Sequence, residues 1–122
     1  MFCILALFLY ILILHLMPKI TYIDQKGNSK TIEVDNGLTV MEGAIQNNVP
    51  GIDADCGGSM ACATCHVYVE DSWFNKLPKA EEAEQDMIDM AYKPNKSSRL
   101  SCQIIVSDEI NGLIVTTPEK QT

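Results

Sequence analysis

The spacing of four cysteines constrains this chain more than any other feature of its sequence. Cys56, Cys62, Cys65 and Cys102 follow the pattern C-x5-C-x2-C-x36-C. A [2Fe–2S] cluster needs four thiolate ligands, two for each iron, and a loop that supplies three of them with a fourth from a distant segment meets that need. The pattern therefore predicts that these four cysteines hold one [2Fe–2S] cluster per chain.

The residues between the cysteines suit a loop that closes around such a cluster. Gly57 and Gly58 have no Cβ atom, so the chain there accepts positive φ angles and brings backbone N–H groups close to the cluster sulfurs. Hydrogen bonds from those groups stabilise the negative charge that a cluster gains on reduction. A glycine pair alone would indicate only a turn, but flanked by three cysteines it favours a cluster cradle.

Three other cysteine chemistries fit the spacing less well. Zinc ribbons usually pair two C-x2-C knuckles, whereas this chain has one such pair and none around Cys102. A redox disulfide between Cys62 and Cys65 would leave the other two cysteines unexplained. A Rieske centre needs two histidine ligands; only His66 is nearby, and in an extended chain its side chain points away from that of Cys65.

The charge balance disfavours nucleic acid as a partner. Sixteen acidic residues face nine basic ones, for a formal net charge of −7, whereas phosphate binding requires Lys and Arg. An acidic surface of this kind favours a partner with a basic face. The cysteine count of five is odd and the spacing is not that of a secreted disulfide framework, which indicates a reducing compartment.

Residues 1–17 form an apolar segment that carries no charged residue. As a helix it would reach roughly 25 Å, slightly short of the roughly 30 Å of a membrane's hydrocarbon core. It lacks the basic region and small-residue cleavage site of a signal peptide, which leaves a membrane anchor or an over-extended start ahead of Met17. If it is an anchor, Lys19, Lys26 and Lys30 place the following domain in the cytoplasm.

The remaining chain, residues 18–122, has the size and pattern of one α+β domain. Alternation predicts a hairpin over residues 19–24 and 31–35, and helical spacing predicts a helix from Leu38 to Ile45 with Thr39 as its N-cap. Further strands are predicted at residues 66–70, 103–106 and 113–115, and an acidic helix over residues 81–92. Several α+β folds are compatible with this order.

The cluster loop and a second segment resemble the adrenodoxin and putidaredoxin group of [2Fe–2S] ferredoxins, including the bacterial ferredoxins of iron–sulfur assembly. Five residues separate the first two cysteines, as in that group, whereas plant-type ferredoxins have four. The resemblance is carried by residues 51–58, 61–69, 86–92 and 98–104, and it extends from about Pro18 onwards. It implies a β-grasp fold, with a mixed sheet, one principal helix and a cluster-binding loop, and a one-electron carrier rather than an enzyme.

The same resemblance implies protein partners. An acidic run is usually only a solvated face, but in this group the matching stretch docks basic patches, which predicts partner docking by Glu82, Glu84, Asp86 and Asp89. The expected donor is an NAD(P)H-dependent flavoprotein ferredoxin reductase, and the expected acceptor is a cytochrome P450 or the iron–sulfur assembly machinery. The compartment would be a bacterial cytoplasm or, in a eukaryote, the mitochondrial matrix.

The resemblance also gives His66 an expected place. It implies a hydrogen bond from His66 toward the region of Tyr92, which would connect the cluster to the acidic helix. An ordinary, satisfied histidine without a coupling role remains the alternative.

Overall fold

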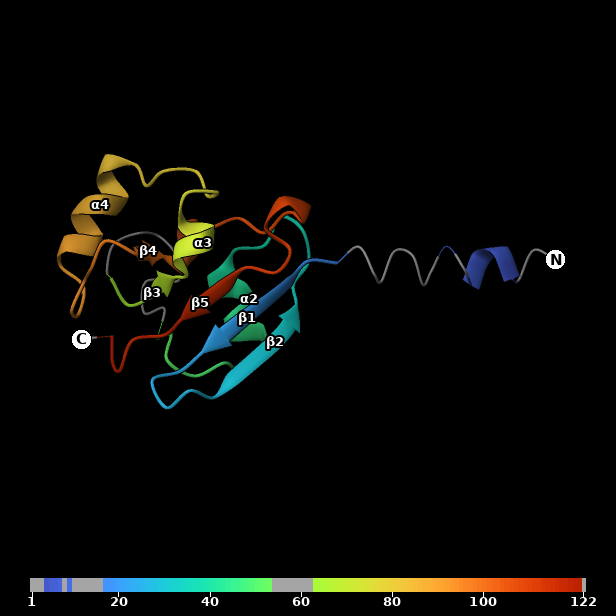
Figure 1. The fold of residues 1–122 in the computed structure, drawn as a ribbon, viewed down its shortest axis with the longest axis horizontal. Coiled ribbons are helices and arrows are strands. Elements are labelled where there is room, and N and C mark those ends of the chain that lie inside the picture. Colours follow the sequence, from blue (N-terminus) through green and yellow to red (C-terminus); the bar gives the residue numbers. More distant parts are fainter. Residues whose placement is uncertain (1–3, 8, 10–16, 54–62, 122) are drawn as a thin grey trace.

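The computed structural model describes residues 4–7, 9, 17–53 and 63–121. Five strands of the described chain form one mixed sheet in the order β2-β1-β5-β3-β4 (Figure 1). They are β1 (Lys19–Ile23), β2 (Ser29–Glu33), β3 (His66–Val69), β4 (Ser98–Leu100) and β5 (Ile114–Thr116). The β1–β5 pair is parallel and the other pairs are antiparallel. This mixed sheet confirms the predicted α+β fold.

The first two strands form the predicted hairpin, and its turn is built around Asp24. The Asp24 carboxylate accepts hydrogen bonds of 2.9 Å from the backbone N–H groups of Lys26 and Asn28. Gly27 adopts a φ of 86°, a conformation that only glycine takes without strain. The turn therefore fixes the register in which Tyr22 pairs with Lys30 and Ile20 with Ile32.

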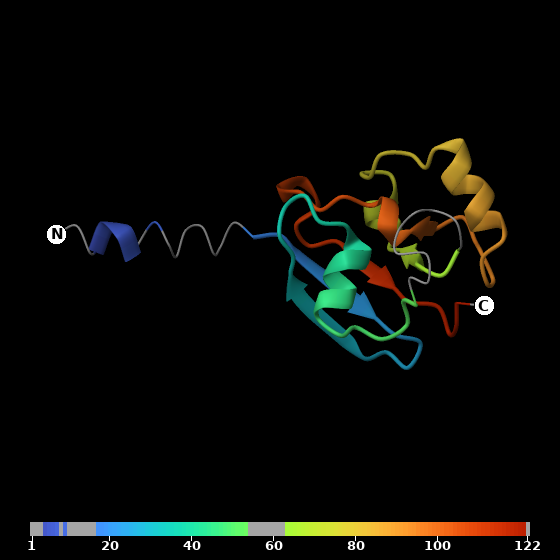
Figure 2. The same ribbon diagram turned by 180° about the vertical axis from the view of Figure 1, so that it is seen from behind.

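The principal helix, α2 (Val40–Gln46), begins at the predicted N-cap. Thr39 accepts a 3.1 Å hydrogen bond from the Glu42 N–H, and the Glu42 carboxylate accepts one from the Thr39 N–H, which completes a capping box. The helix covers one face of the sheet (Figure 2). Gly43 permits close contact there, because a Cβ at this position would lie 2.7 Å from a Val34 methyl carbon.

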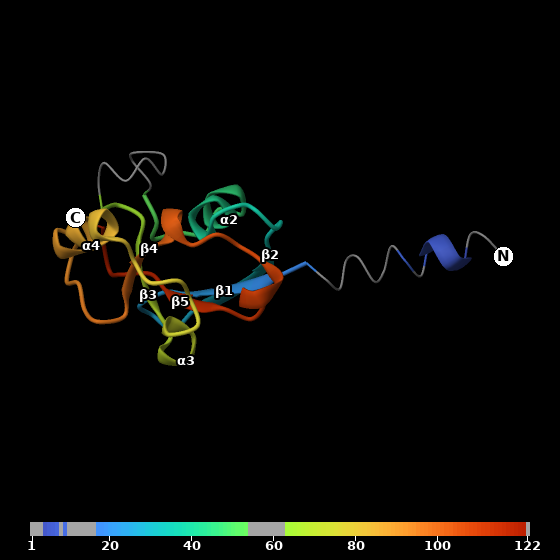
Figure 3. The same ribbon diagram turned by 90° about the horizontal axis from the view of Figure 1, so that it is seen from above.

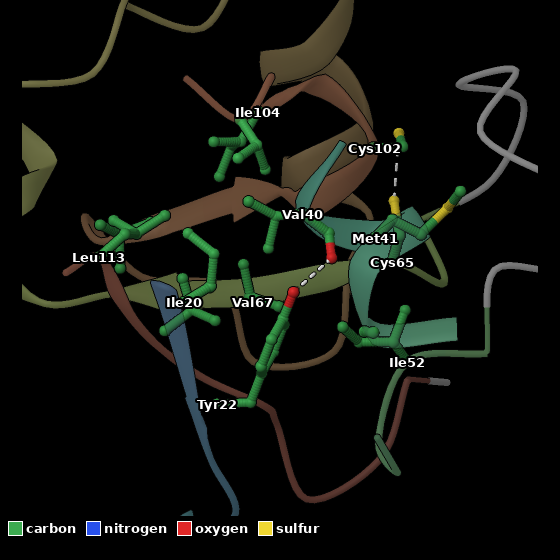
Figure 4. Packing of buried hydrophobic residues seen from close by; sticks show 14 of the residues in the cluster. Ile20, Tyr22, Val40, Met41, Ile52, Cys65, Val67, Cys102, Ile104 and Leu113 are labelled. Carbon is green, nitrogen blue, oxygen red and sulfur yellow. Dashed lines mark hydrogen bonds between the residues drawn. The ribbon is translucent and has the colours of Figure 1, made fainter. Parts of the chain in front are cut away.

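One buried core joins α2 to the sheet (Figure 4). Its fully buried side chains include Ile20, Val40, Val67 and Leu113, from three strands or their ends and from the helix. The Tyr22 hydroxyl lies in this core and donates a 2.7 Å hydrogen bond to the Val40 carbonyl, so its polar atom is satisfied. Burial raises the pKa of Tyr22 far above its usual value, which keeps the hydroxyl protonated.

The second half of the domain carries short helices on both sides of the sheet. They are α3 (Asp71–Phe74), α4 (Glu82–Asp89) and two 3₁₀ turns, η1 (Ser101–Gln103) and η2 (Asp108–Ile110). Figure 3 shows α2 and α3 on opposite faces. The acidic helix is shorter than the predicted 81–92, because the chain turns after its C-cap Met90 and Lys93 takes a φ of 46°.

The strand predicted at residues 103–106 is wrong. The strand that pairs with β3 lies earlier, at Ser98–Leu100, and η1 follows it directly. Ile105 makes only an isolated bridge with Thr39. The segment instead exchanges backbone hydrogen bonds with the stretch that leads into α2, including Val40 N–H to Ile104 O at 2.9 Å.

Residues 4–7 are helical. No helix in the described parts of the chain is long and apolar enough to span a membrane.

Candidate iron–sulfur site

The structure brings two of the predicted ligands together from distant segments. Cys65 precedes β3 and Cys102 lies in η1, and their Sγ atoms are 3.3 Å apart (Figure 4). Both side chains are buried, with exposed fractions of 0% and 6%. Two thiolates bound at about 2.3 Å to one tetrahedral metal ion would lie only a little farther apart. The pair is therefore placed to bind the same metal ion.

Backbone and side-chain hydrogen bonds hold this pair in place. The Cys65 carbonyl accepts from both the N–H and the hydroxyl of Ser101, at 3.0 and 2.7 Å. The Gln103 amide nitrogen lies 3.4 Å from the Cys102 Sγ and donates to it. Donors to cysteine sulfur stabilise the thiolate and the reduced state of a cluster that it binds.

The two remaining predicted ligands, Cys56 and Cys62, lie outside the described residues, as do Gly57 and Gly58. The chain on either side of them is described. Asp53 N–H donates a 3.0 Å hydrogen bond to the Thr64 carbonyl, so the two ends of the cluster-binding loop, residues 54–64, lie next to each other. This closure fits a loop that presents several cysteines to one small cluster. The donor set that the structure shows, buried thiolates with a hydrogen-bond donor to sulfur, fits a [2Fe–2S] cluster.

His66 is buried beside the site but contacts a different residue from the one expected. Its Nε2 lies 2.7 Å from the Ser98 Oγ, and among the described residues its Nδ1 has no hydrogen-bond partner. The link to the Tyr92 region comes instead from Tyr68, whose hydroxyl donates to the Lys93 carbonyl at 2.8 Å. Burial lowers the pKa of His66 to about 4, so the ring is neutral at pH 7.

The four acidic residues predicted to dock a partner do not share one environment. Glu82, Asp86 and Asp89 are exposed on α4, and we call these three the acidic surface. Glu84 is only 3% exposed, so its predicted docking role is wrong. Its carboxylate faces inward and is bound by Arg99.

Arg99 is a structural residue that the sequence interpretation missed. Its Nε and Nη2 donate to the two Glu84 oxygens at 2.6 and 3.0 Å, and its Nη1 donates to the Pro78 carbonyl at 2.8 Å. Glu84 also accepts a 3.0 Å hydrogen bond from the Leu100 N–H. The position of Glu84, one helical turn before the buried Ile88, was the signal that it lies on the inner face of α4.

Comparisons with known proteins identify the class of protein. The profile of the family described as "2Fe-2S iron-sulfur cluster binding domain" matches residues 23–107, so the chain belongs to this family. It is a ferredoxin of the adrenodoxin and putidaredoxin type that binds one [2Fe–2S] cluster per chain. Its role is electron transfer rather than enzymatic catalysis, and the zinc interpretation is set aside.

Known proteins are similar to this chain in sequence, and solved structures are similar to it in fold. The chain is 48% identical over 106 residues to rhodocoxin from Rhodococcus erythropolis, which covers 86% of this chain and 99% of the relative. Its structure is similar to the crystal structure of a ferredoxin from Rhodopseudomonas palustris HaA2, with a TM-score of 0.84 and 42% sequence identity. The match covers 86% of this chain and 100% of that ferredoxin. It is also similar to a chain in the crystal structure of the covalent putidaredoxin reductase–putidaredoxin complex, with a TM-score of 0.79 and 39% sequence identity. That match covers 84% of this chain and 99% of the other.

Proposed function

We propose that this ferredoxin accepts one electron from an NAD(P)H-dependent flavoprotein reductase and passes it to a cytochrome P450 or to the iron–sulfur assembly machinery. Cys56, Cys62, Cys65 and Cys102 would hold the cluster, which supplies one-electron storage when it is bound. The similarity to a chain found in a complex with putidaredoxin reductase supports a reductase as the donor. The domain would occupy residues 18–122, with residues 1–17 a separate segment, in a bacterial cytoplasm or a mitochondrial matrix.

The observation that carries the docking proposal is the position of the acidic surface relative to Cys102. Glu82, Asp86 and Asp89 are exposed on α4, while Glu84 on the inner face of the same helix binds Arg99 and the Leu100 N–H. Leu100 stands two residues before Cys102. A partner attracted by the acids would thus dock on a helix that is rigidly tied to the ligand-bearing segment.

Charge neutralisation with a matched control tests the docking proposal. The pair Asp86→Asn with Asp89→Asn removes two charges from the acidic surface, whereas Glu33→Gln with Asp35→Asn removes two exposed charges near β2, at the opposite end of the sheet (Figure 1). Stopped-flow reduction by a putidaredoxin-type reductase should slow at least about tenfold at low salt for the first pair only. Equal rates for the two pairs would place the docking surface elsewhere.

The acceptor is tested separately with the parent chain. The reduced ferredoxin is mixed without air with a ferric bacterial cytochrome P450 or with a cysteine desulfurase and its assembly scaffold. Haem reduction within milliseconds to seconds would identify the first class, and reductant-dependent cluster formation on the scaffold the second. Failure with both acceptors would overturn this part of the proposal without affecting the reductase result.

A further inference from the structure

The segment after β5 returns to the residues on either side of the cluster-binding loop and contacts them with a buried amide. Residues 117–121, which we call the tail, run toward the end of the molecule that holds β3 and α4 (Figure 1). Gln121 is only 4% exposed and makes three hydrogen bonds with its side chain. A glutamine amide offers two donor hydrogens and one acceptor oxygen, so each of these is used here.

Those three hydrogen bonds join the two sides of the cluster-binding loop. The Gln121 Nε2 donates to the Gly51 carbonyl at 2.6 Å and to the His66 carbonyl at 2.9 Å. Its Oε1 accepts from the His66 N–H at 3.0 Å. Gly51 precedes the first predicted ligand, Cys56, and His66 directly follows Cys65. One side chain thus connects the chain entering the loop to the chain leaving it.

A second, independent contact brings the tail against the same glycine. A Cβ at Gly51 would lie 2.8 Å from both the Cβ and the Oγ1 of Thr117, and Gly51 has a φ of 96°. Thr117 is held in turn by β1, because its N–H donates to the Ile23 carbonyl at 2.8 Å. The tail is therefore anchored on the sheet before it reaches the loop, so Gln121 is presented from a fixed position.

We propose that Gln121 is a positioning residue for the iron–sulfur site, which clamps Gly51 to His66 and thereby fixes Cys65 and limits the access of water to the cluster. The proposal concerns retention and reduction of the cluster and does not depend on which partner reduces the chain. Gln121 acts through two donors and one acceptor. A substitution at this position should therefore weaken cluster retention according to the hydrogen bonds it removes rather than the side-chain volume it removes.

Two substitutions separate the clamp from simple space filling. Gln121→Glu keeps the size and one acceptor but turns a carboxylate toward two carbonyl oxygens, whereas Gln121→Ala removes the side chain. The clamp predicts that the Glu variant is impaired at least as strongly as the Ala variant, while a space-filling role predicts the reverse. Glu119→Gln, an exposed neighbour in the same tail, is the matched control.

The experiment uses the full chain with its cluster, purified without air. Loss of visible absorption is followed in the presence of an iron chelator, and the extent of reduction is measured against a reference redox dye. We expect cluster loss at least about fivefold faster in both Gln121 variants and no change in Glu119→Gln. In Gln121→Ala the reduced form should also be favoured, because water stabilises its extra charge; the carboxylate of Gln121→Glu opposes this effect, so the redox comparison uses the Ala variant.

Far-UV circular dichroism accompanies each measurement. Parent-like cluster loss in Gln121→Glu would overturn the proposal, as would a parent-like dye equilibrium in Gln121→Ala or equally fast cluster loss in Glu119→Gln. Loss of the folded spectrum in both Gln121 variants would also overturn it, since the amide would then support the whole domain rather than the site.

Discussion

The side chains of Glu84 and Arg99 form a buried bidentate ion pair that joins helix α4 to strand β4. The Arg99 Nε lies 2.6 Å from the Glu84 Oε2, and the two side chains are only 4–5% exposed. Each of the three guanidinium nitrogens of Arg99 donates a hydrogen bond, Nε and Nη2 to the Glu84 carboxylate and Nη1 to the Pro78 carbonyl. The pair is therefore a structural link beneath the acidic surface.

Removing one partner of this pair should destabilise the domain strongly. Glu84→Ala would leave the Arg99 guanidinium buried without its counter-charge, which typically costs about 3–5 kcal/mol. For a domain of this size that corresponds to a fall of roughly 12 °C or more in the thermal unfolding midpoint, measured on the cluster-loaded protein without air.

Two variants control this prediction. Glu82→Ala removes an exposed acid from the same helix and should change the midpoint by only about 2–4 °C. Replacing both partners with apolar side chains, as in Glu84→Leu with Arg99→Met, should recover much of the loss. A Glu84→Ala midpoint equal to that of Glu82→Ala would mean that the pair contributes little.

A methyl group at Gly43 should push α2 away from the sheet. The added Cβ would lie 2.7 and 2.9 Å from the two Val34 methyl carbons, closer than packed carbon atoms approach. Gly43→Ala should therefore destabilise the domain by about 1–3 kcal/mol even though alanine favours helices. Denaturant unfolding of the protein without its cluster would measure this, and adding Val34→Ala should restore part of the stability. Unchanged stability in the single variant would show that the helix shifts without cost.

The elements that the sequence predicted correctly are those with local signals. The hairpin has an alternating pattern and a glycine turn, and α2 has Thr39 and Glu42 at capping-box spacing. Residues 103–106 also alternate correctly, since Ile104 and Val106 are buried and Ile105 is 64% exposed. Their partner, however, is the stretch before α2 rather than a strand, and alternation alone does not identify a partner.

Long-range relationships were beyond a local analysis of the sequence. The spacing predicted Cys65 and Cys102 as ligands but not the 3.3 Å approach of their sulfurs, which depends on the pairing of His66 with Leu100 in the sheet. The resemblance predicts a docking role for Glu84 as part of the acidic run, whereas Glu84 binds Arg99, which is fifteen residues away on another element. Buried polar pairs of this kind carry no periodic signature.

The N-cap of α2 should contribute measurably to stability. Thr39→Ala would remove the side-chain acceptor for the Glu42 N–H, which typically costs about 0.5–2 kcal/mol. Thr39→Ser keeps the hydroxyl and should retain most of the stability. Chemical denaturation of the protein without its cluster provides the comparison, and equal losses in the two variants would assign the effect to the threonine methyl group.

Replacing a predicted cluster ligand should abolish the visible spectrum of the cluster. Cys102 is buried and 3.3 Å from Cys65 Sγ, so Cys102→Ser is nearly isosteric and removes one of four thiolates. We expect this variant to retain less than about a tenth of the parent's cluster absorption after anaerobic reconstitution, because iron–sulfur clusters are held by cysteine thiolates. Cys3→Ser, which changes the cysteine outside the predicted ligand set, should show the full spectrum. Normal cluster content in Cys102→Ser would remove Cys102 from the ligand set, whereas loss of the cluster in Cys3→Ser would show that the four-cysteine assignment is incomplete.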